Sequence, residues 1–217
     1  MSVWVVVVAA GRGQRFGTAK QFARLGGRTM VQWAVDASRA VADGVVLVLP
    51  AGDGPEADDP GRVTTGADAV VVGGDTRAAS VRAGLAAVPD SAEVIVVHDG
   101  ARPLASPALF RAVVDAVVVG GAEAAIPGIP VADTLKRVEG DGVTGTVART
   151  GLVSVQTPQA FRAEVLRRAH ATGSDATDDA GLVESLGATV RVVPGEPRNI
   201  KVTTVGDLEV AQALAVR

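Results

Sequence analysis

A run of valines interrupted by one tryptophan, Val3–Val8, constrains the fold of this chain most. A strand that is hydrophobic at consecutive positions is typical of a parallel sheet covered by helices on both faces. The run then breaks into small residues and a glycine-rich basic loop that extends to Lys20. Open α/β sheets bind their ligands beyond the carboxyl ends of their strands. We therefore expect this loop to contact a ligand.

The loop combines three glycines with three cations that fall within nine residues: Gly11, Gly13 and Gly17, and Arg12, Arg15 and Lys20. Glycines let the backbone bend sharply and approach a ligand closely, and the cations suit phosphate groups. We interpret the loop as a cradle for a triphosphate. The alternative is an ordinary turn between a strand and a helix, with solvated arginines.

Two familiar nucleotide-binding motifs do not fit this loop. The dinucleotide motif G-x-G-x-x-G fails because Phe16 stands at its third glycine, and the P-loop fails because Gly17 is followed by Thr18 and Ala19. A nicotinamide dehydrogenase also needs an acidic residue near the end of the second strand, where Leu49 and Pro50 stand. Such a dehydrogenase is therefore disfavoured.

Strand-like and helix-like segments alternate along the first two thirds of the chain and again near its end. Expected strands after the first are 44–50, 69–72, 93–98, 122–127 and 188–193; expected helices are 29–40, 77–88, 107–119, 161–172, 178–186 and a last one beginning near Thr204 or Gly206. Thr29 is the candidate N-cap of the first helix. This alternation predicts an α/β fold: a doubly wound, mostly parallel, Rossmann-like sheet with helices on both faces. At 217 residues we expect a single domain, 1–217.

The pattern changes at Val131, where the helical period is lost. The segments 135–138 and 143–148 flank Glu139-Gly140-Asp141-Gly142, a good hairpin turn. Because an isolated hairpin is only marginally stable, this projecting β-arm, about 131–152, needs a surface to lie against. That surface is either its own domain or, as we favour, a partner subunit.

Charge and composition exclude several classes of protein. The net charge of −3 offers no general attraction for nucleic acid or an anionic membrane. No cysteine is present, which excludes disulfides and thiolate chemistry. No stretch reaches the ~18 apolar residues of a membrane span, and the immediate first strand leaves no room for a signal peptide. We expect a cytoplasmic protein that binds neither nucleic acid nor membranes.

Two further strand ends carry candidate ligand-binding residues. Gly74 and Asp75 follow the third expected strand, where glycines let the backbone reach a planar base, and Ser80 lies about one helical turn beyond. The alternative is that Asp75 or Thr76 simply caps the next helix. His98, Asp99 and Gly100 end the fourth expected strand.

Asp99 could contact a ribose hydroxyl, a substrate hydroxyl or Mg²⁺, or it could cap the following turn. We expect His98 to be a packed or orienting residue rather than a base. The adjacent pair Asp178-Asp179 is expected to cap a helix, and no role is assigned to His170. Arg149 and Lys201 matter only if the fold brings them to the first loop.

The catalytic inventory favours phosphoryl or nucleotidyl transfer. The sequence has no G-x-S-x-G and no H-x-x-x-H motif, so nucleophilic triads and zinc hydrolysis lack their residues. A phosphate monoester, with a second pKa near ~6, is already an anionic nucleophile at neutral pH. Catalysis then requires mainly alignment and charge neutralisation by Arg, Lys and Mg²⁺.

Seven motifs in order give a family resemblance over practically the whole chain: AAGRGQRFG…KQF, GGDTRAASVRAGL, VVHDGARP, DTLKRV, RTGLVSVQTPQAF, TDDAGLVE and NIKVT. Together they resemble the 2-C-methyl-D-erythritol 4-phosphate cytidylyltransferases of the non-mevalonate isoprenoid pathway. The resemblance implies that CTP and the methylerythritol phosphate react, with Mg²⁺, to give the cytidine diphosphate derivative and pyrophosphate. The Mg²⁺ would be carried mainly by the CTP phosphates, with no protein residue assigned to it.

The resemblance also implies roles for individual residues. Catalytic residues would be Arg15, Lys20, Arg149 and Lys201; nucleotide-binding residues would be Ala9, Ala10, Gly11, Gly13, Gly74, Asp75, Ser80, Asp99 and Gly100; substrate-binding residues would be Asp99, Thr134, Arg149 and Lys201. Thr134 and Arg149 would reach the active site of the partner subunit in a homodimer joined through the arm. The chain ends where a fused cyclodiphosphate synthase would begin, which implies a monofunctional enzyme.

Two other functions stay open from the sequence. A ribitol 5-phosphate cytidylyltransferase shares the loop and most of the motifs, and only the acceptor pocket separates it from the first reading. A non-catalytic nucleotide-binding regulator is the other, although retention of the four catalytic cations argues against it.

Overall fold

The computed structural model describes residues 1–11, 20–51 and 66–215, and within these ranges the chain builds a central eight-stranded sheet. The strand order is β10-β7-β11-β6-β1-β4-β5, and β12 also pairs with β7. The strands are β1 (Val3–Val8), β4 (Gly44–Leu49), β5 (Ala69–Val72), β6 (Val94–Asp99), β7 (Ala124–Pro130), β10 (Val153–Val155), β11 (Gln159–Arg162) and β12 (Val190–Pro194). The predicted mostly parallel α/β sheet is confirmed: β6, β1, β4 and β5 run parallel, and β12 runs parallel to β7.

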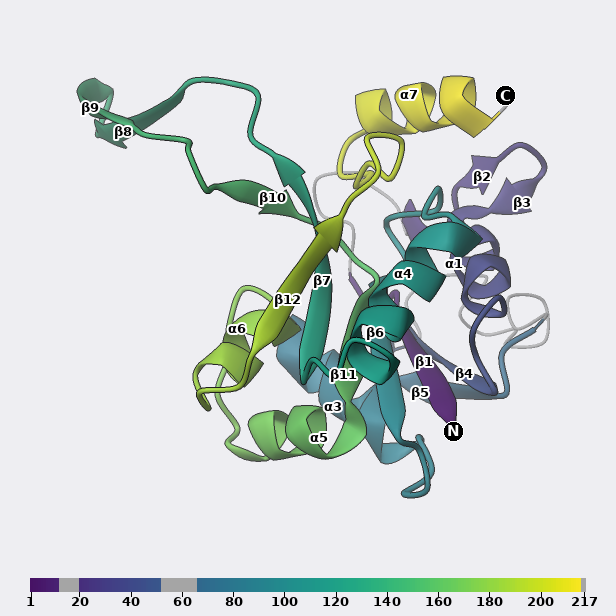
Figure 1. Ribbon diagram of the computed structural model, residues 1–217. Helices are drawn as coiled ribbons and strands as arrows, with labels where there is room; N and C mark the ends of the chain where they lie inside the picture. The colour runs from purple at the N-terminus through teal and green to yellow at the C-terminus, as the bar shows by residue number, and fades with distance from the viewer. Residues whose placement is uncertain (12–19, 52–65, 216–217) are drawn as a thin grey trace.

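Helices cover both faces of the sheet (Figure 1). They are α1 (Met30–Ser38), α3 (Arg77–Ala86), α4 (Pro107–Val118), α5 (Ala163–Ala171) and α6 (Asp179–Glu184). A further helix, α7 (Val205–Ala215), lies beyond the sheet (Figure 1). Odd-numbered valines of β1 pack in one core with α1 and α4, whereas Val6 packs in a second core with α3, α5 and α6. This division of successive side chains explains why the strand must be hydrophobic at every position.

Local sequence signals set the ends of the helices as expected. Thr29 is the N-cap of α1, where its side chain accepts a hydrogen bond from the backbone N–H of Gln32, and the Gln32 side chain accepts one from the backbone N–H of Thr29. A short 3-10 helix, η1 (Lys20–Phe22), and the small pair β2 (Arg24–Leu25) and β3 (Arg28–Thr29) precede α1. Leu25 and Met30 form a third small core with Val202 and Ala211 near α7.

The predicted helix 161–172 is wrong at its start. Phe161 lies in β11, which pairs antiparallel with β6 and β7, and α5 begins only at Ala163. The phenylalanine side chain is fully buried in the sheet core, so tertiary packing outweighs the weak helical preference of this short segment. β10 is also antiparallel to β7, a pairing that the hydrophobic pattern of the sequence does not indicate.

The predicted hairpin arm is present. β8 (Leu135–Glu139) pairs antiparallel with β9 (Gly142–Val147), with a bulge at Arg137 and Val138. Figure 1 shows this hairpin projecting away from the sheet, beyond β7 and β10. Of the helices in the described ranges, none is long and apolar enough to cross a membrane. The extent of the single domain, 1–217, stays a prediction.

Candidate functional site

Three segments that are distant in sequence meet at the carboxyl edge of the sheet. The backbone N–H of Ala9 donates to Val48 in β4, and that of Gly100 donates to Val8 in β1. The packing there leaves little room, because a Cβ added to Gly100 would lie 3.0 Å from the Cβ of Ala9. The ends of β1, β4 and β6 thus lie side by side, as the strand-end rule predicts.

Gly73 is the tightest of these contacts. A Cβ at this position would overlap the Cβ of Ala10 and lie 2.7 Å from the hydroxyl of Ser80. The loop after β5 therefore approaches the loop after β1 only because this residue has no side chain.

Replacing Gly73 with alanine is expected to lower the free energy of unfolding by about 1–3 kcal/mol, because the added methyl group overpacks the junction. Urea unfolding at neutral pH measures this change. Gly145→Ala in the arm is the matched control, because a Cβ there meets nothing within 4 Å. Equal stability of the two variants would contradict the tight junction.

The sequence-predicted base-contact residues lie at the start of α3. Thr76, rather than Asp75, is the N-cap, and its side chain accepts from the N–H of Ala79. Ser80 is buried, and its hydroxyl lies within hydrogen-bonding distance of the carbonyls of Gly74 (3.2 Å) and Thr76 (3.0 Å). Gly74 and Asp75 are exposed beside it. Ser80 therefore shapes the loop, and the exposed backbone of that loop is what remains accessible to a ligand.

Asp99, the last residue of β6, is the electrostatic centre of this edge. One carboxylate oxygen lies 3.3 Å from Nε and 3.2 Å from Nη2 of Arg77, and the other accepts from Lys201 Nζ at 2.7 Å. Burial alone would raise the pKa of the Asp99 carboxyl, but the charges of Arg77 and Lys201 outweigh it and hold that pKa well below its usual range. The carboxylate therefore stays ionised at any working pH.

Lys201 reaches Asp99 because a buried polar network fixes the segment that carries it. Val202 donates to the carbonyl of Ala101. The Asn199 carbonyl accepts from Arg102 at 2.8 Å, while the Asn199 amide donates to the carbonyl of Thr157 at 2.9 Å. Two predicted site residues separated by about a hundred positions are thereby joined.

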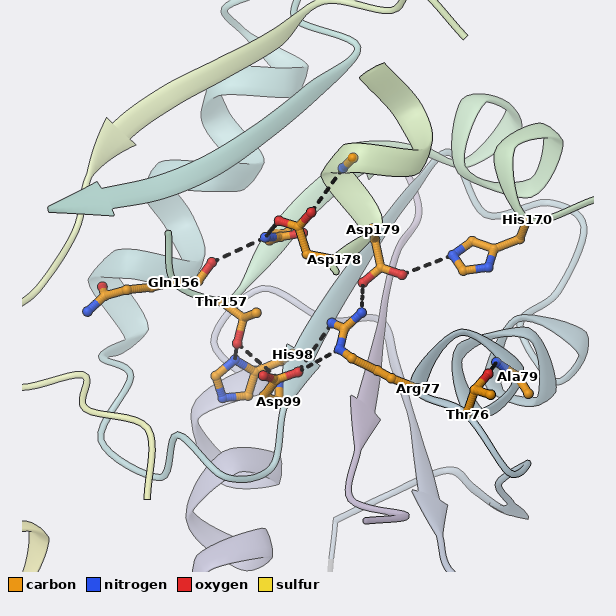
Figure 2. A network of polar contacts seen from close by, with 12 residues as sticks. Thr76, Arg77, Ala79, His98, Asp99, Gln156, Thr157, His170, Asp178 and Asp179 are labelled. Atoms are coloured by element: carbon orange, nitrogen blue, oxygen red, sulfur yellow. Dashed lines mark hydrogen bonds and ion pairs between the residues drawn. The ribbon is translucent and has the colours of Figure 1, made fainter. Parts of the chain in front are cut away.

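His98 is a packed, orienting residue. It is fully buried, against the ring of Phe110. Its Nε2 lies 3.2 Å from the Arg102 carbonyl, which can only accept, so Nε2 carries the proton. Nδ1 therefore accepts from the Thr157 hydroxyl at 3.1 Å, and the Thr157 oxygen accepts the backbone N–H of Asp99 at 3.0 Å. This series of hydrogen bonds supports the backbone of Asp99 (Figure 2).

Sequence reasoning missed Arg77 and misjudged Asp179. Asp178 does cap α6, accepting from the N–H of Gly181. Asp179, however, is buried, lies 2.8 Å from Nη1 of Arg77 and contacts His170 Nε2 at 2.9 Å (Figure 2). Burial would lower the pKa of the Arg77 guanidinium, but the two carboxylates outweigh it and raise that pKa. The adjacent acidic pair was the available signal, because two carboxylates at one helix start exceed what capping requires.

Two further predicted site residues, Thr134 and Arg149, stand apart from this cluster in the described part of the chain. Thr134 and Arg149 are exposed on the arm, and the Arg149 guanidinium donates to the carbonyl of Ala132. The described hydrogen bonds and ion pairs link neither residue to Asp99 or Lys201. Gly13 and Arg15 lie outside the described residues, and Lys20 begins η1 just after them. Gly11, before the gap, is exposed.

The residues in the described ranges form no group of three or more His, Cys, Asp or Glu that could hold a metal ion. Both carboxylate oxygens of Asp99 already contact cations. The donor set in this part of the chain therefore does not fit a dedicated protein cage for Mg²⁺, which requires several oxygen ligands.

Comparison with known proteins identifies the same family from three directions. The family model for 2-C-methyl-D-erythritol 4-phosphate cytidylyltransferase matches residues 3–217. A protein of that name from Rhodococcus opacus (strain B4) is 49% identical over 98% of this chain and 94% of its own length. One from Deinococcus radiodurans is 44% identical over 96% of this chain and 88% of its own.

Solved structures agree with these sequence matches. The crystal structure of 2-C-methyl-D-erythritol 4-phosphate cytidylyltransferase from Thermus thermophilus superposes with a TM-score of 0.82 at 40% identity and covers 100% of both chains. The 4-diphosphocytidyl-2C-methyl-D-erythritol synthase of Anaerococcus prevotii gives a TM-score of 0.83 at 30% identity, over 100% of this chain and 99% of its own. With the Asp99–Lys201 cluster at the expected sheet edge and a whole-chain match, this protein belongs to the 2-C-methyl-D-erythritol 4-phosphate cytidylyltransferase family.

Proposed function

We propose that this chain transfers CMP from CTP to 2-C-methyl-D-erythritol 4-phosphate, giving 4-diphosphocytidyl-2-C-methyl-D-erythritol and pyrophosphate. The observation that carries the proposal is the ion-pair cluster in which Asp99 contacts both Arg77 and Lys201 at the carboxyl edge of the sheet. The chain that holds this cluster matches the family along its length. The relatives do not favour ribitol 5-phosphate as the acceptor.

In the reaction, an oxygen of the acceptor phosphate attacks the α-phosphorus of CTP, and the bond from that phosphorus to the β-phosphate oxygen breaks. No proton has to be removed from the nucleophile, because the phosphate monoester is already anionic. The chain's task is therefore alignment and neutralisation of charge. Arg15 and Lys20 would face the charge that builds on the α-phosphate and the departing pyrophosphate.

Lys201 is suited to hold the acceptor phosphate. Its side chain is 44% exposed while its ammonium group contacts Asp99. An exposed lysine with three donors can keep one contact with a carboxylate and direct another to an incoming phosphate. Asp99 would contact hydroxyls of the ribose and acceptor.

Mg²⁺ is proposed as the cofactor, carried mainly by the CTP phosphates. The ion would supply charge neutralisation on the triphosphate.

A homodimer joined through the arm is proposed to complete each site. The arm exposes Val138 and Val143, whose side chains remain 60% and 64% accessible in the single chain. Apolar side chains on a projecting hairpin favour a covering surface. Thr134 and Arg149 would then contact the acceptor bound to the partner subunit. A cytoplasmic location and the absence of nucleic-acid and membrane partners stay predictions.

Replacing Arg149 with alanine is expected to raise KM for the methylerythritol phosphate about 10-fold while KM for CTP stays within about 2-fold, because one charge-assisted contact to the acceptor is lost. Steady-state kinetics with each substrate varied in turn measures the split. Arg137→Ala, another exposed arginine of the arm, is the control. An equal loss of CTP binding would contradict the proposed division of labour.

The activity itself is tested by a pyrophosphate-release assay with CTP and Mg²⁺. We expect turnover with 2-C-methyl-D-erythritol 4-phosphate and at least about 100-fold lower kcat/KM with ribitol 5-phosphate, since a site built for one set of hydroxyls rejects the other. Preference for ribitol 5-phosphate would overturn the assigned acceptor. No turnover with either would overturn the proposed function.

A further inference from the structure

Arg77 lies between two buried carboxylates that belong to different parts of the fold. Its Nε and Nη2 face Asp99 at the end of β6, while its Nη1 lies 2.8 Å from Asp179 at the first turn of α6. Asp99 and Asp179 are 8% and 1% exposed. Figure 2 shows the guanidinium seated between them. The planar fork of one arginine thus joins the candidate site to α6.

A second contact continues from Asp179 away from the site. His170, in α5, approaches the other carboxylate oxygen with Nε2 at 2.9 Å and is 3% exposed. Its Nδ1 is buried and has no hydrogen-bond partner within the described part of the chain. An ionised carboxylate only accepts, so Nε2 carries the proton. The order of contacts is therefore His170, Asp179, Arg77 and Asp99.

Stability alone is a weak reason for this arrangement. Buried ion pairs seldom stabilise a fold more than well-packed apolar side chains would, because the charges must be desolvated. The start of α6 is already capped by Asp178. A second carboxylate does fix the orientation of the Arg77 side chain, because a guanidinium held at both ends of its fork has one plane and one position.

A fixed orientation of Arg77 matters because Lys201, the other partner of Asp99, is exposed and can bind an incoming phosphate. Lys201 is 44% accessible, whereas the Arg77 side chain is 27% accessible. An incoming phosphate shares the ammonium group of Lys201 with Asp99, so the lysine is divided between two anions. Among the described cations in contact with the Asp99 carboxylate, Arg77 is then the one that holds this carboxylate without also binding the phosphate.

We propose that Asp179 and His170 are positioning residues for the transfer reaction: they fix the Arg77 guanidinium so that Asp99 keeps one orientation while Lys201 engages a phosphate. This inference rests on the proposed function, because it assigns Asp99 a contact with the bound substrates. Neither residue touches substrate in this scheme. Both act only through Arg77.

A double-mutant cycle tests the proposal in the full-length enzyme. Asp179→Ala is expected to lower kcat/KM about 10-fold in the pyrophosphate-release assay. In an Arg77→Leu background the same Asp179→Ala change is expected to have less than about a 2-fold further effect, because its mediator is gone. A merely structural role for Asp179 predicts equal effects in both backgrounds and would overturn the proposal.

Asp178→Ala is the matched control, because it removes the cap of α6 and the hydrogen bond that Gln159 donates to Asp178 without touching Arg77. We expect its melting temperature to fall by about 2–4 °C, as for a lost cap in a chain of this size, with kcat/KM unchanged within about 2-fold. A loss of about 10-fold in kcat/KM in this variant would show that any disturbance of α6 impairs the enzyme and would overturn the proposal.

Substitutions at His170 test the outer contact and remain informative if Asp179→Ala does not fold. Glutamine can present an N–H where Nε2–H stands, whereas leucine cannot. We expect His170→Gln to retain most of the kcat/KM and His170→Leu to lose about 5-fold. Equal values in these two variants would overturn the role of His170. An inactive wild-type enzyme would instead indicate failure of the proposed function.

Discussion

Replacing Lys20 with alanine is expected to lower kcat by roughly 10²–10³-fold, the usual scale for one lost electrostatic contact to a transition state. Lys20 follows the basic glycine loop and begins η1. In the proposed mechanism its charge offsets the charge that builds on the α-phosphate and the departing pyrophosphate. Because that charge is greatest in the transition state, the loss should appear in kcat and kcat/KM with little change in KM. Single-turnover and steady-state kinetics with CTP and the methylerythritol phosphate measure it.

The chain offers a direct control for this experiment, because it contains only three lysines, Lys20, Lys136 and Lys201. Lys136 is exposed on the arm, where its ammonium group donates to the Thr146 hydroxyl, and Lys136→Ala removes the same charge without touching the glycine loop. We expect its kcat to stay within about 2-fold of the wild type. A Lys20→Ala enzyme with near-normal kcat would remove Lys20 from the mechanism.

The parallel part of the sheet was predictable because its strands can be recognised from their local sequence. Val3–Val8 and Gly44–Leu49 are continuous hydrophobic runs followed by small or turn-forming residues. A strand buried on both faces has no other composition available to it. The antiparallel strand Gln159–Arg162 carries no such signal, since Ala160 and Phe161 are only two hydrophobic residues in a row and fit a helix start equally well. Only its neighbours β6 and β7 decide its structure.

The candidate site divides along the same line. Asp99 and Gly100 were predictable because strand ends of an open sheet meet at one edge. The pairing of Asp99 with Lys201 follows from contacts of Asn199, Arg102 and Thr157, which are long-range and leave no periodic trace. Arg77 was overlooked because a single arginine at the start of a helix resembles a solvated surface charge. Only the structure shows that it pairs with two buried carboxylates, Asp99 and Asp179.

The arm shows a limit of a different kind. Its hairpin was predictable from the turn Glu139-Gly140-Asp141-Gly142, and β8 and β9 form as expected. The surface against which the hairpin packs was not predictable, because the residues that a projecting hairpin contacts need not belong to its own chain. The proposed roles of Thr134 and Arg149 therefore depend on the assembly rather than on the fold of one chain.

Acidification below about pH 6.5 is expected to destabilise the protein through His98. Burial disfavours the imidazolium form and lowers the pKa of His98 from 6.5 to about 4, although the Asp99 carboxylate and the hydrogen bond to the Arg102 carbonyl act in the opposite direction. In the unfolded chain the same imidazole binds a proton near pH ~6.5. Between these two values the unfolded state binds more protons, so this contribution is complete above about pH 6.5 and is lost as the pH falls toward about 4.

The size of the effect follows from the shift, since one pKa unit corresponds to about 1.4 kcal/mol, so the full contribution is about 3 kcal/mol. Local geometry gives the same direction. Nδ1 of His98 accepts from Thr157, whose oxygen also accepts the backbone N–H of Asp99. A proton on Nδ1 would turn this acceptor into a donor and disturb the hydroxyl that supports Asp99. The free energy of unfolding should therefore fall, and the hydrogen-bonded support of Asp99 should be lost, over the same pH range.

Urea unfolding of the wild type and of His98→Gln at about pH 7.5 and about pH 4.5 measures this contribution. Glutamine does not titrate but can still donate an N–H toward the Arg102 carbonyl. We expect the wild type to lose about 2.5 kcal/mol more than the variant between the two pH values, because titration of the carboxylates is common to both proteins and cancels. The wild type would still be the more stable protein at the higher pH. Parallel losses in the two proteins would contradict a neutral, buried His98 as the source of acid sensitivity.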